Sequence, residues 1–302
     1  MKRIIAVISA LVLGTVLAGC ASEEQEPVVR MNKDELFDYA TENVTDYMPG
    51  MASEIFWDSE YGTYETITYY SETCKRDRRA VVLLPANYDK SKKYPVLYAL
   101  HGYWGDENSL PGDSSLKLQY IIGNAIASGE AQEMIVVFPY IFASETREVL
   151  DGMNAESNAA YDNFINDLVN DLMPYMKKHF SILTGRESTA ITGFSMGGRE
   201  SIYIGIERPD LFGYIGAVCP APGVDTDLLS VDEICFDEGE EPYLFYITAG
   251  AVDTVVYSTP ATYHGYLEQN GVDHIYQNIQ GAGHDGSSIR PHIYNFIRFI
   301  FK

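Results

Sequence analysis

The chain has 302 residues, of which 46% are hydrophobic and 21% charged, and this is ordinary globular material, enough for one large α/β domain. The formal net charge is −22, and such an acidic body repels nucleic acid and anionic lipid headgroups. Composition therefore argues against a nucleic-acid-binding protein and against membrane attachment through charge.

The chain begins with MKRIIAVISALVLGTVLAGCAS, in which two basic residues precede an apolar run from Ile4 to Leu17. This run is too short for a good membrane span and is typical of a secretion signal. It ends in Leu-Ala-Gly-Cys, which resembles a bacterial lipobox, where the cysteine is lipidated and becomes the new N-terminus. An ordinary signal cleaved near Ala21 is the alternative.

We expect residues 1–19 to be a lipoprotein signal peptide, Cys20 to be lipidated and residues 20–33 to form a polar tether. The protein would then be exported and held on the outer side of a bacterial membrane by its lipid alone. The folded domain is expected over residues 34–302.

Several short β-rich or apolar runs follow the tether. Thr63–Tyr70 and Arg79–Leu84, separated by a polar segment, predict an antiparallel hairpin. Later runs are apolar along their whole length, which is typical of buried parallel strands. They are Tyr94–Leu100, Met134–Phe138, Thr189–Thr192, Tyr214–Val218, Tyr243–Thr248 and His274–Ile279.

Helical patterns lie between these strands, at Lys117–Ala127, Tyr161–Phe180, Gly198–Arg208, Thr262–Asn270 and Ser288–Phe301. Pro174 should kink or break the second of them, because proline has no N–H to donate. Strands that alternate with helices predict an α/β domain with a mostly parallel central sheet, helices on both faces and an N-terminal hairpin.

A serine lies between a predicted strand and a predicted helix, in Gly193-Phe194-Ser195-Met196-Gly197. This stretch fits G-x-S-x-G in the strand–turn–helix context that the pattern requires. Small neighbours let the strand and helix approach, and the helix N-terminus directs amide groups toward the serine. We predict that Ser195 is a nucleophile.

A nucleophilic serine needs a base, and His284 in QGAGHDGSS follows the last strand, at the carboxyl edge of the sheet. It also follows Ser195 in the chain, as the order serine, acid, histidine demands. We predict that His284 accepts the serine proton. The remaining histidines fit less well by order or position: His101, His179, His264, His274 and His292.

The acid that orients His284 is expected at Asp253, which follows the strand YLFYIT in TAGAVD. It would hold the histidine in the correct tautomer and stabilise the imidazolium. Asp225 and Asp227 follow the previous strand and remain rivals. Asp285 is adjacent to His284 in the chain, and adjacent loop residues rarely face one another.

Backbone amides after Ser195 and after an early strand should form an oxyanion hole. Met196 provides the first, and the loop LHGYWG points to the amide of Tyr103 for the second. We interpret His101 as a structural side chain that supports this loop. Trp104 would either stack on a substrate ring or pack in the core.

No cofactor and no metal are expected. Cys74, Cys219 and Cys235 have no metal-type spacing, and an exported protein can join two of them in a disulfide. The acidic segment Asp225–Glu241 offers oxygen ligands for calcium, but it lacks the spacing of a calcium loop. We favour a solvated surface there.

Four stretches resemble the carbohydrate esterases of the feruloyl and acetylxylan esterase type, relatives of the esterase D group. They are KKYPVLYALHGYWGDENS, NFINDLVNDLMPYMKKHFSI, AITGFSMGGRESIYIG and NIQGAGHDGSS, and the similarity runs from about Tyr64 to the C-terminus. The resemblance implies the α/β-hydrolase fold, with its serine, aspartate and histidine at Ser195, Asp253 and His284.

These observations predict a serine esterase that acts through an acyl-enzyme on feruloyl or acetyl esters of plant-wall, xylan-derived saccharides. A siderophore esterase, or a general short-chain acyl esterase, would use the same residues. A non-catalytic surface binding protein is the remote alternative.

Overall fold

The computed structural model describes residues 30–224 and 228–302. The expected signal peptide, Cys20 and most of the expected tether lie outside these residues, as do Asp225 and Asp227. Within the described ranges, no helix is both long and apolar enough to cross a membrane.

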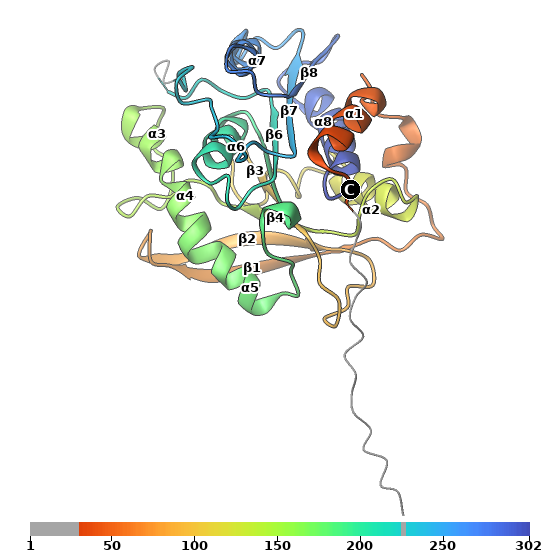
Figure 1. The fold of residues 1–302 in the computed structure, drawn as a ribbon. Helices are drawn as coiled ribbons and strands as arrows, with labels where there is room; N and C mark the ends of the chain where they lie inside the picture. The colour runs from red at the N-terminus through yellow and green to blue at the C-terminus, as the bar shows by residue number, and fades with distance from the viewer. Residues whose placement is uncertain (1–29, 225–227) are drawn as a thin grey trace, which may run out of the picture. The chain divides into compact units, whose positions relative to one another are not determined.

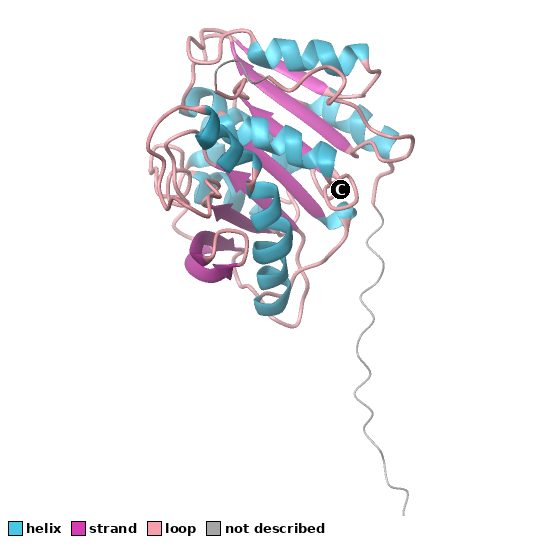
Figure 2. Ribbon diagram, turned by 90° about the vertical axis from the view of Figure 1, so that its left-hand side faces the viewer, coloured by secondary structure: helices cyan, strands magenta, loops and turns pink. Residues whose placement is uncertain are grey.

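One sheet of eight strands organises the fold, in the order β1-β2-β4-β3-β5-β6-β7-β8 (Figures 1 and 2). Its strands are β1 (Thr63–Ser71), β2 (Arg76–Leu84), β3 (Val96–Leu100), β4 (Ile135–Pro139), β5 (Thr189–Phe194), β6 (Tyr214–Val218), β7 (Leu244–Gly250) and β8 (Ile275–Ile279). β1 and β2 form the expected antiparallel hairpin, β2 pairs antiparallel with β4, and every later pair is parallel. The predicted fold class is confirmed.

Helices cover both faces of the sheet, because the central strands are buried on both sides (Figure 1). One face carries α1 (Lys33–Asn43), α2 (Leu118–Ala127) and α8 (Gly286–Phe299). The other carries α3 (Ala155–Asp162), α4 (Phe164–Asp167), α5 (Met173–His179), α6 (Met196–Glu207) and α7 (Thr259–Gln269). Two short 3-10 turns, η1 (Gly50–Ser53) and η3 (Arg186–Ser188), lie in the connections before β1 and before β5.

Helix α1 was not predicted from the sequence. Its start is a capping box, in which the side chain of Asn32 accepts from the Glu35 amide and the Glu35 side chain accepts from the Asn32 amide. Just before it, the Met31 amide donates to the Lys302 carbonyl. The described fold therefore begins two or three residues before position 34, within the segment that we expected to be tether.

The long helix expected over residues 161–180 is broken, as Pro174 predicts. A π-helical turn, η2 (Leu168–Leu172), lies between α4 and α5, and the Met173 amide donates to the Leu168 carbonyl five residues back. Pro174 then occupies the first turn of α5, where its missing N–H costs nothing.

A buried ion pair ties β2 to this helix. The Arg78 Nε lies 3.1 Å from Oδ2 of Asp167, and both side chains are almost completely buried. The Tyr69 hydroxyl donates to the same carboxylate oxygen at 2.6 Å. Burial raises the pKa of Asp167, and the charge of Arg78 opposes that rise.

We expect Arg78→Ala to lower the free energy of unfolding by about 3–5 kcal/mol, because it leaves the buried Asp167 carboxyl without its counter-charge. Urea unfolding followed by circular dichroism measures the change. Lys75→Ala, which removes the exposed Lys75–Glu72 pair, is the matched control with an expected loss of about 0–1 kcal/mol. Equal losses in the two variants would contradict this prediction.

Candidate active site

Ser195 occupies a tight turn between β5 and α6. Its φ of 58° and ψ of −117° are a conformation that residues with a side chain rarely adopt. The turn is held because the Ser195 amide donates to the Val218 carbonyl and the Ser195 carbonyl accepts from Ala221, each at 3.0 Å.

The glycines around Ser195 permit a close approach of three backbones. A Cβ atom at Gly193 would lie 2.2 Å from the Gly197 carbonyl oxygen, and one at Gly197 would lie 2.4 Å from the Leu100 carbonyl oxygen. Both distances are far inside van der Waals contact, so β5, α6 and the end of β3 meet only with glycine at these positions. The pattern G-x-S-x-G therefore reflects packing as well as backbone freedom.

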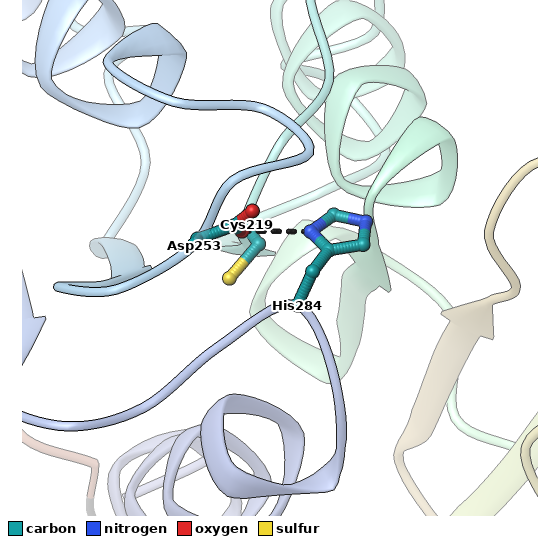
Figure 3. A group of neighbouring side chains, drawn as sticks. All are labelled: Cys219, Asp253 and His284. Carbon is teal, nitrogen blue, oxygen red and sulfur yellow. Dashed lines mark hydrogen bonds and ion pairs between the residues drawn. The ribbon is translucent and has the colours of Figure 1, made fainter.

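His284 lies in the loop between β8 and α8 and faces Ser195. Its Nε2 lies 2.9 Å from the Ser195 Oγ, and its Nδ1 lies 2.7 Å from Oδ2 of Asp253 (Figure 3 shows the second contact). The imidazole ring packs on Phe194, with ring centroids 4.5 Å apart. The structure thus brings together all three residues that the sequence nominated as nucleophile, base and acid.

Asp253 follows β7 and holds its carboxylate in a fixed position. Its Oδ1 accepts from the amides of Val255 at 2.8 Å and Val256 at 3.2 Å, so that Oδ2 is left for His284. Burial raises the pKa of Asp253, but hydrogen bonds from His284 and from these two amides outweigh it, so its pKa lies below the usual value. The carboxylate is therefore ionised at neutral pH.

Asp285 has a different task. Its side chain caps α8, where it accepts from the Ser287 amide at 2.8 Å and from the Ser287 hydroxyl at 2.5 Å. It is thus engaged at the helix start, although it adjoins His284 in the chain. Of the other rival acids, Asp225 and Asp227 lie outside the described residues.

The loop after β3 lies directly against the nucleophile turn. A Cβ atom at Gly102 would stand 3.3 Å from the Ser195 Cβ, so the peptide that links Gly102 to Tyr103 begins next to the serine. The Met196 amide is the first of α6, where N–H groups have no acceptor within the helix. Both amides nominated from sequence therefore flank Ser195.

His101 supports this loop, as expected. The side chain is buried, with its Nε2 3.0 Å from the Ile141 amide nitrogen and its Nδ1 2.7 Å from the Gly102 carbonyl oxygen. Trp104 is 61% exposed, so it does not belong to the core.

Cys219 was missed as a neighbour of this site. It follows β6 directly, and its Sγ lies with one atom each of Asp253 and His284 inside a group spanning 4.8 Å (Figure 3). Such a group has the composition of a metal site, but burial raises the pKa of the thiol to about 12, which keeps it protonated. Since Asp253 and His284 also bind each other, the donor set fits a hydrogen-bonded triad better than a metal. The position of Cys219 directly after a buried strand was the sequence signal that could have placed it at this edge of the sheet.

Cys74, Cys219 and Cys235 are all free thiols in the structure, and the first two are buried. The disulfide that the sequence allowed is therefore not formed. In the acidic segment, Glu233 accepts from the Ser230 amide at 2.6 Å, which is a local turn contact.

Apolar side chains are exposed on the loops that follow β3, β4 and β7, and these loops belong to the same carboxyl edge as Ser195. We call these side chains the apolar rim: Trp104, Val149, Met153, Val252, Val255 and Tyr257. Singly exposed apolar residues are common, and these six give the loops at this edge an apolar character.

With this geometry, a hydroxyl is hydrogen-bonded to an imidazole whose other nitrogen is held by a carboxylate. The imidazole can take the hydroxyl proton, and the carboxylate stabilises the resulting positive charge. The two flanking amides can stabilise a negative oxygen close to Ser195.

The chain is similar to several known proteins. The model of the family named Esterase matches residues 71–235. A CE1 ferulic acid esterase of Anaeromyces mucronatus is 41% identical, with a TM-score of 0.81 over 86% of this chain and 98% of its own, and it has also been solved with ferulic acid bound.

More distant relatives share part of the chain or the fold alone. An endo-1,4-beta-xylanase/feruloyl esterase of Xylanibacter ruminicola is 31% identical over 164 residues, which are 53% of this chain and 22% of that protein. This chain therefore matches only about a fifth of the length of that curated relative. An S-formylglutathione hydrolase of Staphylococcus aureus, 17% identical with a TM-score of 0.59 over 82% of this chain and all of its own, shares the fold.

The family model spans more than half of the chain, and the Anaeromyces mucronatus esterase matches along almost its whole length. The chain therefore belongs to the esterase family and has the α/β-hydrolase fold.

Proposed function

We propose that this protein is a serine esterase that hydrolyses carboxylic esters, with feruloyl or acetyl esters of xylan-derived saccharides as its substrates. The observation that carries this proposal is the continuous hydrogen-bonded chain from Asp253 through His284 to Ser195. The similarity to ferulic acid esterases supports the choice of substrate class.

The proposed reaction begins when the Ser195 Oγ attacks the ester carbonyl carbon and His284 Nε2 takes the hydroxyl proton. The carbonyl oxygen becomes an oxyanion, which the amides of Tyr103 and Met196 stabilise. His284 then gives its proton to the leaving sugar oxygen, and the acyl group stays on Ser195. Water, activated by the same imidazole, releases the acid. Asp253 keeps Nδ1 protonated throughout.

The apolar rim favours an aromatic acyl group. A hydroxycinnamoyl ring offers a flat apolar face to side chains such as Trp104 and Tyr257, both exposed at the edge that carries Ser195. An acetyl group would leave most of this surface unused. The net charge of −22 is consistent with neutral saccharide substrates and gives no attraction to acidic polymers.

We also propose that the protein is exported and anchored to a bacterial membrane through a lipid on Cys20. The support is the N-terminal pattern alone: two basic residues, an apolar run and the ending Leu-Ala-Gly-Cys.

Ser195→Ala should abolish hydrolysis of p-nitrophenyl acetate in a folded protein, because it removes the attacking atom. Asp253→Asn should lower kcat on the order of 10⁴-fold, since an amide N–H facing Nδ1 favours the tautomer that cannot accept the serine proton. Ser91→Ala, an exposed serine, is the control and should match wild type. Undiminished turnover by Ser195→Ala would refute the assignment, and a mild effect of Asp253→Asn would transfer the acid role to Asp225 or Asp227.

An ester panel tests the substrate class. We expect kcat/KM to be highest for methyl ferulate, lower for acetylated xylo-oligosaccharide and lowest for a siderophore trilactone, because the apolar rim stabilises an aromatic acyl group. Ser195→Ala gives the background rate for each ester. A strong preference for the trilactone would refute the polysaccharide proposal while leaving the triad intact.

The lipid anchor is tested by expressing the full chain in a bacterium that processes lipoproteins. Cys20→Ser should lose both palmitate labelling and membrane retention, because the acylated thiol is gone. Cys235→Ser, which removes the exposed cysteine of the fold, is the matched control and should keep both. Labelling that survives Cys20→Ser would contradict the proposal.

A further inference from the structure

The protonation of His101 can be assigned from its two neighbours. The Ile141 backbone nitrogen, 3.0 Å from Nε2, is a donor, so Nε2 carries the lone pair and accepts. The proton of the neutral ring is therefore on Nδ1, which donates to the Gly102 carbonyl at 2.7 Å. Burial lowers the pKa of His101 to about 4, so the ring is neutral at pH 7.

The donor to Nε2 is itself held in place. Arg78 donates to the carbonyls of Tyr140 and Phe142, on either side of Ile141. The Tyr140 ring stacks on the His101 ring, with centroids 5.7 Å apart and planes at 21°. The fold therefore presents a fixed N–H to one side of His101, which selects the tautomer.

The Gly102 carbonyl receives a second hydrogen bond, from the Gly105 amide at 3.1 Å. This bond closes a tight turn in which Trp104 has a φ of 67°. A Cβ atom at Gly105 would lie 2.6 Å from the His101 Nδ1, so the turn packs directly on the ring. Two donors thus fix the direction of the Gly102 carbonyl.

A trans peptide unit is planar, and its C=O and N–H point in opposite directions. No peptide bond in the described structure is cis. Because the Gly102 carbonyl points toward His101, the N–H of the next residue, Tyr103, points away from it. This peptide borders the nucleophile, since a Cβ atom at Gly102 would lie 3.3 Å from the Ser195 Cβ.

We propose that His101 is a positioning residue for ester hydrolysis, which through Nδ1–H holds the Gly102–Tyr103 peptide so that the Tyr103 amide faces the oxyanion formed at Ser195. The inference rests on the proposed function for its catalytic meaning. In this role His101 affects stabilisation of the oxyanion in the transition state, which a residue that only supports the loop does not. The role requires the tautomer in which Nδ1 carries the proton.

Two substitutions separate the contacts of His101. Asparagine places an amide N–H near the position of Nδ1 and keeps the bond to Gly102. Glutamine places its amide near Nε2 and keeps an acceptor for the Ile141 amide. If His101 acts through Nδ1–H, His101→Gln should lower kcat toward the roughly 10²-fold loss that follows removal of one oxyanion donor. We expect KM to stay within about threefold, since the contact matters in the transition state.

His101→Asn should retain kcat within about tenfold of wild type, and it should also have the lower Tm, because it leaves the buried Ile141 amide without an acceptor. Activity and stability are thus expected to rank the two variants in opposite orders. If His101→Asn loses as much kcat as His101→Gln, or more, the inference is wrong and His101 only supports the loop.

The tautomer is tested in the wild-type protein, without any variant. Nitrogen-15 NMR of histidine-labelled protein at pH 7 should show His101 with a protonated Nδ1 and an unprotonated Nε2. A protonated Nε2 would overturn the inference whatever the kinetics show. Wild type and Ser195→Ala are assayed beside the His101 variants. If wild type has no esterase activity, the proposed function fails, and the NMR result still decides which nitrogen of His101 carries the proton.

Discussion

The close approach of α6 to the end of β3 is the constraint on which the rest of the site depends. At Gly197 the two backbones come so near that a Cβ atom would lie 2.4 Å from the Leu100 carbonyl oxygen. The approach places the first amide of α6, the hydroxyl of Ser195 and the loop that begins at His101 around one point. It also requires the unusual backbone of Ser195, since the chain reverses there within one residue.

Histidines in this fold differ in their environment, and so in what they can do. His101 and His292 are buried; the second lies between the hydroxyls of Thr192 and Thr248, and burial lowers its pKa to about 3. Neither ring is hydrogen-bonded to a carboxylate among the described residues, and burial outweighs the attraction of Asp106 for a charged His101, so both remain neutral and serve as hydrogen-bonding parts of the scaffold. His284 is partly exposed and bonded to Asp253, so its charged form has a partner. Of these three histidines, His284 is therefore the one placed to transfer a proton to and from Ser195.

The buried ion pair between Arg78 and Asp167 is linked to the loop that follows β3. Arg78 links Asp167 on the helix to the carbonyls on either side of Ile141, and Ile141 in turn contacts His101. A chain of polar contacts thus connects the Asp167 carboxylate to the loop that begins at His101. The π turn η2, which interrupts the helix before Pro174, begins immediately after Asp167. The interruption therefore adjoins the residue that pairs with Arg78.

Local patterns in the sequence were enough to predict the parallel sheet, the hairpin, the strand–turn–helix around Ser195 and the candidates His284 and Asp253. These are properties of short stretches, since apolar runs, glycines and chain order reflect steric rules that act over a few residues. α1 had a local signal as well, the capping box at Asn32, although it was overlooked. The tertiary structure alone decided that Cys219 lies beside the triad and that the Ile141 amide selects the His101 tautomer. Each of these depends on distances between segments far apart in the chain, which are set by packing across the whole sheet.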